Sequence, residues 1–227
     1  MVMKHIYEGK TKSVFQLEDG NYLLKMKDAV TGADGKIDPG ANQVIGQVSG
    51  MGHASLKMSE YFFEKFNAAG IKTHFISADL TADTMTVKPA EPFGAGLEFI
   101  CRFRAYGSFL RRYGKYAQAG QQLQALVEIT LKDDDRGDPL INEDALEELQ
   151  LLSKEECAQA KSMTKRLAEI IRADLGAKGM ELYDIKFEFG RSQGQIMLID
   201  EVSGGNMRVF KDGQQLEALT LTKMILA

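Results

Sequence analysis

The sequence has few cysteines, no excess of basic residues and no long apolar run. Only Cys101 and Cys157 occur among 227 residues, which is too few for a disulfide framework or a cysteine-rich metal site. Cys101 lies in a strand-like run and Cys157 in a helix-like pattern. We expect both to be buried side chains without a chemical role, because free cysteine is usually buried.

The charge balance argues against nucleic-acid binding. Lys plus Arg number 28 and Asp plus Glu 32, a net charge of −4, so the chain has no broad basic face. Nowhere do roughly 18 apolar residues run together, and residues 1–8 lack the apolar run of a signal peptide. We therefore expect a cytoplasmic globular protein with no nucleic-acid or membrane partner.

The chain is long enough for one large or two small domains. The stretch 89–96 is rich in Pro, Gly and Ala and is the candidate boundary. The prediction is an α+β fold with two lobes, an N-terminal β-rich, nucleotide-binding lobe at 1–92 and a larger α+β lobe at 93–227 with the metal and substrate sites.

Short strands separated by turn residues dominate the pattern. Six glycines between residues 31 and 52 predict a long loop there. Helices are predicted at 56–69 and 153–175, the second starting with a Ser153–Glu156 capping box. Strands are predicted at 5–7, 13–17, 22–26, 73–76, 84–87, 97–103, 126–131, 182–189 and 196–202, the last two forming a hairpin around the loop 190–195.

The strand at 183–189 alternates strictly, so its apolar side chains share one face and Asp184, Lys186 and Glu188 share the other. A half-exposed strand gives the same pattern. The following strand places Asp200 among apolar neighbours, where a carboxylate is costly unless it is paired or binds a metal. Glu188 and Asp200 are therefore candidate ligands for Mg²⁺, which takes a few carboxylates plus phosphate and water. Lys186 is a candidate for neutralising phosphate charge, and Asp184 for orienting a group or accepting a proton.

Two further segments suggest anion binding. In the turn 7–12, a glycine permits close approach of the backbone, and Lys10 and Lys12 could contact phosphates; an ordinary surface turn looks the same, and no Walker or dinucleotide loop is present. Arg102 and Arg104 share a strand face, and Ser108 follows in a turn into a helical segment. That group suits a sugar phosphate, and a solvated, salt-bridged edge is the alternative.

Six segments in order along the chain resemble the SAICAR synthetase (phosphoribosylaminoimidazole-succinocarboxamide synthase) family, and the chain looks like a divergent member of it. The resemblance implies a ligase that joins the carboxylate of carboxyaminoimidazole ribonucleotide (CAIR) to the amine of L-aspartate through an acyl phosphate, with ATP cleaved to ADP and phosphate. It also implies a fold related to kinase and ATP-grasp folds, with ATP in the cleft, and a homodimer. The six segments are 7–12, 28–36, 102–108, 132–139, 184–190 and 200–202.

The resemblance also implies roles for individual residues. Such chemistry needs positioning and charge neutralisation more than a nucleophile, so we expect none of the three histidines to be catalytic. The implied residues are Gly9, Lys10, Thr11, Lys12 and Lys88 for ATP, Glu188 and Asp200 for Mg²⁺, Asp34, Arg102, Ser108 and Arg208 for substrate, and Asp138, Asp184 and Lys186 for catalysis.

The chain departs from the family pattern on the substrate side. Before Arg208 the family usually has Thr or Ser, then Pro-Asp, whereas Gly204 and Gly205 stand here. The loop at 46–55 differs as well, and the tail at 219–227 is short. A ligase with another carboxylate and amine, a small-molecule kinase with a similar Asp-x-Lys, and a non-catalytic nucleotide-binding module are the alternatives. Dependence of turnover on an amine distinguishes a ligase from a kinase.

Overall fold

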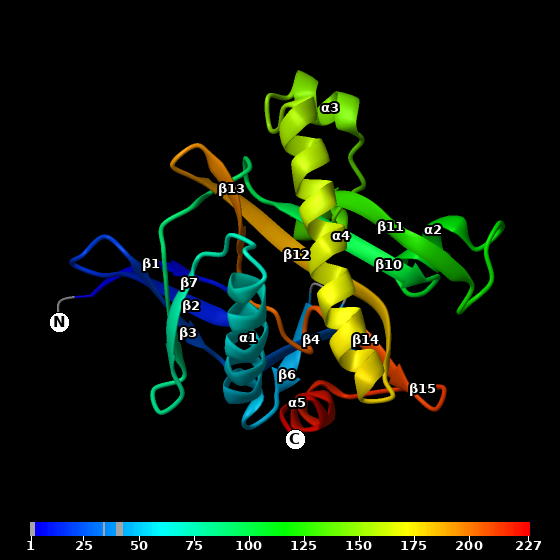
Figure 1. Cartoon of the computed structure of the whole chain (residues 1–227), viewed down its shortest axis with the longest axis horizontal. Helices are drawn as coiled ribbons and strands as arrows, with labels where there is room; N and C mark the ends of the chain where they lie inside the picture. Colours follow the sequence, from blue (N-terminus) through cyan, green and yellow to red (C-terminus); the bar gives the residue numbers. More distant parts are fainter. Residues whose placement is uncertain (1–2, 34, 40–42) are drawn as a thin grey trace. The chain divides into compact units, whose positions relative to one another are not determined.

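A computed structural model describes residues 3–33, 35–39 and 43–227. Its antiparallel sheets and helices (Figure 1) confirm the α+β class. The chain forms two compact units. The first contains the chain up to Glu91 with the late segments Glu201–Gly205 and Glu217–Ala227, and the second contains Pro92–Asp200 and Asn206–Leu216. The sequence-based division had placed all of 93–227 in the second lobe.

The first unit is built on an antiparallel sheet with strand order β1-β2-β3-β8-β7. Helix α1 (Met51–Ala68) packs against β3 and β7. It buries Leu56, Phe62 and Phe66 completely, so the apolar stripe predicted for this helix forms the core of the unit. The strands are β1 (Lys4–Glu8), β2 (Lys12–Gln16), β3 (Tyr22–Met26), β7 (Phe75–Asp79) and β8 (Thr84–Val87).

The glycine-rich stretch is where the prediction of a long loop was wrong. It contains a small sheet of β4 (Ala29–Ala33), β5 (Lys36–Ile37) and β6 (Gln43–Gln47). Each strand has only two to five residues, which is too short for a strand pattern to stand out among the surrounding glycines. Helix α1 also begins five residues earlier than predicted. Its first amides donate to the distant carboxylate of Asp28, at 3.2 Å from Gly50 N and 2.9 Å from Gly52 N.

A short helix, α5 (Ala218–Leu226), closes the chain and packs against α1. The sequence showed only a short tail here. The helix passes very close to Gly204, because a Cβ added at Gly204 would lie 2.7 Å from Ala218 Cβ and 2.8 Å from Ala218 Cα. Only glycine fits this position, which explains why a bulkier residue is absent there.

The second unit contains an antiparallel sheet with strand order β11-β10-β12-β14-β15, with β13 beside β12. The predicted hairpin exists, but its loop is shorter than the predicted 190–195. Only Gln193 and Gly194 connect its strands, with φ of 51° and 71°, as a tight hairpin turn requires. The strands are β9 (Glu91–Pro92), β10 (Leu97–Arg104), β11 (Gln122–Leu131), β12 (Glu181–Ser192), β13 (Gln195–Ile199), β14 (Met207–Lys211) and β15 (Gln214–Gln215).

Helix α4 (Lys154–Ala177) lies across β10 and β12 (Figure 1) and starts with the predicted Ser153–Glu156 capping box. The apolar side chains of the sheet face it and are buried, as at Phe99, Ile185 and Phe187. The other helices are α2 (Ser108–Tyr113), α3 (Glu143–Glu148) and the 3-10 turn η1 (Asp134–Arg136). Within the described ranges, no helix is long and apolar enough to cross a membrane.

Candidate active site

The face of the second unit's sheet that points away from α4 is polar but not solvated. Asp184, Lys186 and Glu188 share this face of β12, as the alternation predicted. The exposed fractions of Asp184 and Glu188 are only 3% and 8%. The interpretation as an ordinary half-exposed strand is therefore wrong, because buried carboxylates must be compensated by specific partners.

Asp184 lies at the centre of an arginine cluster, which we define as Arg102, Arg112, Arg208, Glu128 and Asp184. Arg102 on β10 and Arg208 on β14 are the register partners of Asp184 on either side. Arg102 Nη1 donates to Asp184 Oδ2 at 3.0 Å, and Arg208 Nη1 donates to both carboxylate oxygens at 3.0 and 2.9 Å. The cross-strand register thus places two guanidinium groups on one buried carboxylate.

Arg102 is almost completely buried and is fixed by three partners. Besides Asp184, its Nε donates to Glu128 Oε2 at 2.5 Å and its Nη2 to Ser108 Oγ at 2.9 Å. Arg112 also donates to Glu128, at 2.7 Å. Three arginines face two carboxylates, so the cluster has a net charge of 3 − 2 = +1. A rigid cationic fork of this kind suits a phosphate or carboxylate.

Gly107 allows Arg208 to reach the cluster. Its φ is 55°, and an added Cβ would lie 2.8 Å from Arg208 Cζ. The glycine therefore provides both the left-handed backbone conformation and the space for the guanidinium. Ser108 follows directly as the first residue of α2, so the segment 107–108 contributes a hydrogen bond to Arg102 and the space for Arg208.

Asp184 was predicted to orient a group or to accept a proton. In the structure both of its carboxylate oxygens accept hydrogen bonds from arginines. This arrangement favours the orienting role, because the arginines that bind it are the candidate substrate ligands. Glu128 and Arg112 were not predicted as part of the site. Glu128 reaches Arg102 from β11, through a strand pairing that the sequence does not reveal.

A second group on the same sheet face is the carboxylate–lysine cluster, defined as Glu98, Lys132, Lys186, Glu188 and Asp200. Glu98 of β10 is the register partner of Glu188 on β12, and like charges placed opposite each other are unfavourable. Lys186 Nζ lies 2.5 Å from Glu98 Oε1 and 3.8 Å from Glu188 Oε1. Lys132 Nζ donates to the two Glu188 oxygens at 2.8 and 2.9 Å.

Burial and mutual charge determine the protonation of this cluster. Burial, and then the charge of Asp200, raises the pKa of Glu188, while Lys186 and Lys132 act in the opposite direction. Burial lowers the pKa of Lys186, but the carboxylates of Glu98 and Glu188 outweigh it, so that the pKa is raised. Lys186 is therefore protonated at neutral pH.

Asp200 does not lie on the strand, which corrects the prediction of its position. Strand β13 ends at Ile199, the register partner of Glu188, and Asp200 follows with a left-handed φ of 69°. Residues 3–33, 35–39 and 43–227 contain no group of three or more His, Cys, Asp or Glu side chains arranged to hold a metal. Glu188 and Asp200 supply two hard oxygen donors, which fits a cation that completes its coordination with phosphate and water, as Mg²⁺ does.

The model of the SAICAR synthetase family matches residues 5–223. The chain belongs to this family. A phosphoribosylaminoimidazole-succinocarboxamide synthase from Clostridium tetani is 54% identical over 226 residues, covering 99% of this chain and 100% of that protein. The same enzyme from Pyrobaculum calidifontis is 35% identical, covering 95% and 85%. A structure of SAICAR synthetase (Type-2) in complex with ADP superposes with a TM-score of 0.82 at 28% identity, covering 92% of this chain and 86% of that chain.

The Gly-Lys turn lies in the first unit, between β1 and β2. Gly9 N donates to Lys12 O at 2.9 Å, and a Cβ at Gly9 would lie 3.0 Å from that oxygen. Lys27, which was not predicted, donates from Nζ to Gly9 O at 2.8 Å and also pairs with Glu8. The turn is thereby held in one conformation, as a backbone that approaches a ligand should be.

The lysines predicted for ATP differ in their surroundings. Lys12 forms an ion pair with Glu201, and both side chains are largely buried. Lys10 is exposed in the turn. The carbonyl oxygen of Thr11 accepts a hydrogen bond from the backbone amide of Lys27 at 2.8 Å. Lys88 follows β8 as an exposed residue.

Two other residues were predicted for the site. Asp34 is outside the described residues. Asp138 belongs to the loop after β11, where its Oδ1 accepts the amide of Asp133 at 2.9 Å and its φ is 50°. Asp138 therefore shapes the loop that starts with Lys132.

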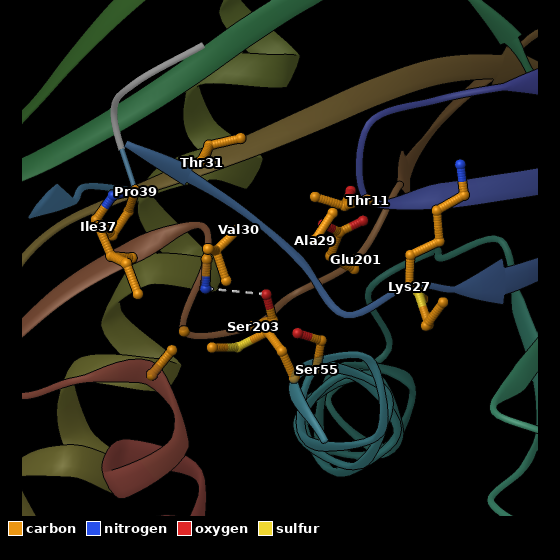
Figure 2. A pocket seen from close by; sticks show the side chains of 15 residues that line it. Thr11, Lys27, Ala29, Val30, Thr31, Ile37, Pro39, Ser55, Glu201 and Ser203 are labelled. Atoms are coloured by element: carbon orange, nitrogen blue, oxygen red, sulfur yellow. Dashed lines mark hydrogen bonds between the residues drawn. The ribbon is translucent and has the colours of Figure 1, made fainter. Parts of the chain in front are cut away.

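The segment that departs from the SAICAR synthetase pattern lines a pocket of about 60 Å³ in the first unit. Figure 2 shows Ser203 near Val30 of β4 and Ser55 of α1. Gly204 and Gly205 form another part of the wall. The two glycines are thus accommodated by packing around a small pocket next to α5.

Proposed function

We propose that this chain is an ATP-dependent ligase that joins the carboxylate of CAIR to the amine of L-aspartate, giving SAICAR, ADP and phosphate in purine biosynthesis. Membership of the SAICAR synthetase family over residues 5–223 supports this assignment, as do the names of its relatives and the ADP-bound structure. The observation that carries it is the composition of β12, which contributes Asp184 to an anion-binding cluster and Lys186 and Glu188 to a phosphoryl-transfer cluster.

In this proposal the arginine cluster binds the ribonucleotide. Arg102 and Arg208, with Ser108, hold the phosphate or carboxylate of CAIR. Asp184 fixes the two guanidinium groups before substrate arrives, so little rotamer freedom is lost on binding. The net positive charge of the cluster favours an anion.

The carboxylate–lysine cluster serves the nucleotide. Glu188 and Asp200 would hold Mg²⁺, which neutralises phosphate charge when bound. Lys186 is held by Glu98 and presents a fixed positive charge to the transferring phosphoryl group. Transfer to a carboxylate depends mainly on such positioning and charge stabilisation. Asp138 is proposed to act near aspartate, through the loop after β11.

The remaining assignments follow the family pattern. Gly9, Lys10, Thr11 and Lys12, together with Lys88, are proposed to bind ATP, and Asp34 to bind substrate. We further propose a cytoplasmic homodimer. Light scattering coupled to size-exclusion chromatography measures the oligomeric state directly, and a mass near 25.2 kDa would contradict the dimer.

ADP release with and without the amine tests the type of reaction. With Mg-ATP and CAIR present, we expect steady ADP release only when L-aspartate is added. Release at the same rate without any amine would contradict the ligase and indicate a kinase. Glu188→Gln and Asp200→Asn should each abolish steady release, and unchanged turnover of either variant would contradict the metal assignment.

A further inference from the structure

Lys132 binds the two carboxylate oxygens of Glu188, which are the atoms that a metal ion would coordinate. Its Nζ lies 2.8 Å from Oε1 and 2.9 Å from Oε2, so one ammonium group binds both carboxylate oxygens. A carboxylate coordinates a divalent cation through the same two atoms. The lysine and a metal ion therefore compete for one ligand.

Lys132 reaches Glu188 from a different element and with an adaptable side chain. It follows the last residue of β11, and its backbone amide donates to Gly96 O at 3.1 Å. Its stem crosses Gly96, where an added Cβ would lie 3.1 Å from Lys132 Cδ. The side chain is 43% exposed, so it borders solvent into which it can turn.

Lys186 differs from Lys132 in its position on the sheet, its exposure and its principal partner. It extends from β12 itself and its Nζ lies 2.5 Å from Glu98 and 3.8 Å from Glu188, with a side chain 26% exposed. Its principal partner is Glu98, which is not one of the proposed metal ligands. Of the two lysines in the cluster, Lys132 is the one whose contact would have to be broken by a metal ion.

The charge count gives the exchange a driving force. With every group in its ionised form, two lysines face three carboxylates, a net charge of 2 − 3 = −1. A divalent cation added with both lysines in place would give −1 + 2 = +1 and would put two cations, the metal ion and Lys132, on one carboxylate. Movement of Lys132 away from Glu188 removes that repulsion.

We propose that Lys132 is an exchangeable cation that holds Glu188 while no divalent cation is bound and leaves when one binds. This inference rests on the proposed metal role of Glu188 and Asp200. Lys132 is then a positioning residue, because it binds both oxygens of the buried carboxylate and fixes its orientation. It also weakens the binding of free metal ions, which favours entry of the metal together with a nucleotide.

A titration with Mn²⁺ alone, followed by electron paramagnetic resonance without nucleotide, tests the exchange. The neutral variant Lys132→Met should bind Mn²⁺ on the order of tenfold more tightly than the native protein, because one neighbouring charge changes the preference of a carboxylate by that factor or more. Lys132→Arg retains the charge and should bind Mn²⁺ as weakly as the native protein. Equal Mn²⁺ affinity in the native protein and Lys132→Met overturns the proposal.

Two controls separate displacement from general electrostatic repulsion. Lys154→Met removes an exposed lysine that pairs with Glu147, and it should leave Mn²⁺ affinity unchanged. In a Glu188→Gln background the effect of Lys132→Met should disappear, because the shared ligand is gone. A tenfold gain that persists without Glu188 contradicts displacement.

The Mn²⁺ titration tests the role of Lys132 separately from the ligase assay. If the native protein forms SAICAR and Lys132→Met does not alter Mn²⁺ affinity, the role of Lys132 is wrong and the proposed function stands. If neither protein binds Mn²⁺, the metal assignment and the exchange fail together. Circular dichroism of each variant verifies that the comparison is between folded proteins.

Discussion

Arg102 and Asp184 lie directly opposite each other on neighbouring antiparallel strands, and their side chains form a buried ion pair of 3.0 Å. The exposed fractions of the two side chains are 1% and 4%. A pair this deeply buried is stable only while both partners and their hydrogen bonds are present. This single relationship links the stability of the second unit to its proposed substrate site.

Replacement of Arg102 by Met should destabilise the protein by about 3–5 kcal/mol, because the carboxylates of Glu128 and Asp184 lose a buried partner. Denaturant-induced unfolding measures the change. Arg104→Met is the matched control on the same strand face. Arg104 pairs with the half-exposed Glu181, and its loss should cost no more than about 1 kcal/mol. Equal losses in the two variants would contradict the role given to burial.

Gly107→Ala should weaken binding of the ribonucleotide, because its methyl group would push the Arg208 guanidinium out of place. We expect the KM for CAIR to rise by about tenfold or more, the effect of losing one hydrogen bond to a charged group. Gly120→Ala is the control. Gly120 has φ of 76° with no atom within 4 Å of an added Cβ. An alanine there is therefore destabilised only by the left-handed backbone conformation and displaces no neighbour. A KM increase of the same size in Gly120→Ala would show that backbone strain, not Arg208, is responsible.

Neither cysteine should react in the folded protein. Burial raises the pKa of Cys101 to about 12 and also raises that of Cys157. A raised pKa keeps the thiol neutral at pH 8, and only the thiolate attacks a disulfide reagent. Ellman's reagent at pH 8 should therefore detect no thiol in the native protein and both thiols in guanidinium. Rapid modification of one thiol in the native protein would place that cysteine at an accessible site.

Gly204→Ala should destabilise the first unit by roughly 1–3 kcal/mol, the usual cost of overpacking, because its Cβ would overlap with Ala218 of α5. Gly205→Ala is the control, since the nearest atom to its added Cβ is Ser203 Oγ at 3.3 Å, and a side-chain oxygen can move. Thermal unfolding of the two variants checks the difference. A smaller loss for Gly204→Ala than for Gly205→Ala would contradict the account of the packing against α5.

The alternation in β12 predicted which residues share a face, and the capping box predicted the start of α4. Both signals are local, so the sequence contains them. The burial of Asp184 and the roles of Glu98, Glu128 and Lys132 depend on which strands pair and in which register. These partners are far apart in sequence, and no local sequence pattern predicts which strands pair or in which register.

The largest error, in the stretch 31–52, has a related cause. Strands β4 to β6 are short and form by pairing with one another, as where Gly32 lies opposite Ile37 and Val30 opposite Gly46, and α1 is capped by Asp28 from outside the helix. Helix α5 was missed because its nine residues carry too few periodic positions to be distinguished from a tail. In each case the determining contact is tertiary.

The central claim is best tested by mass spectrometry of the product. Purified protein is incubated with Mg-ATP, CAIR and L-aspartate, and each component is omitted in turn. We predict a succinocarboxamide product, with one ADP formed per product, only in the complete mixture. ADP without that product in the complete mixture would contradict the claim and direct the search to another carboxylate and amine.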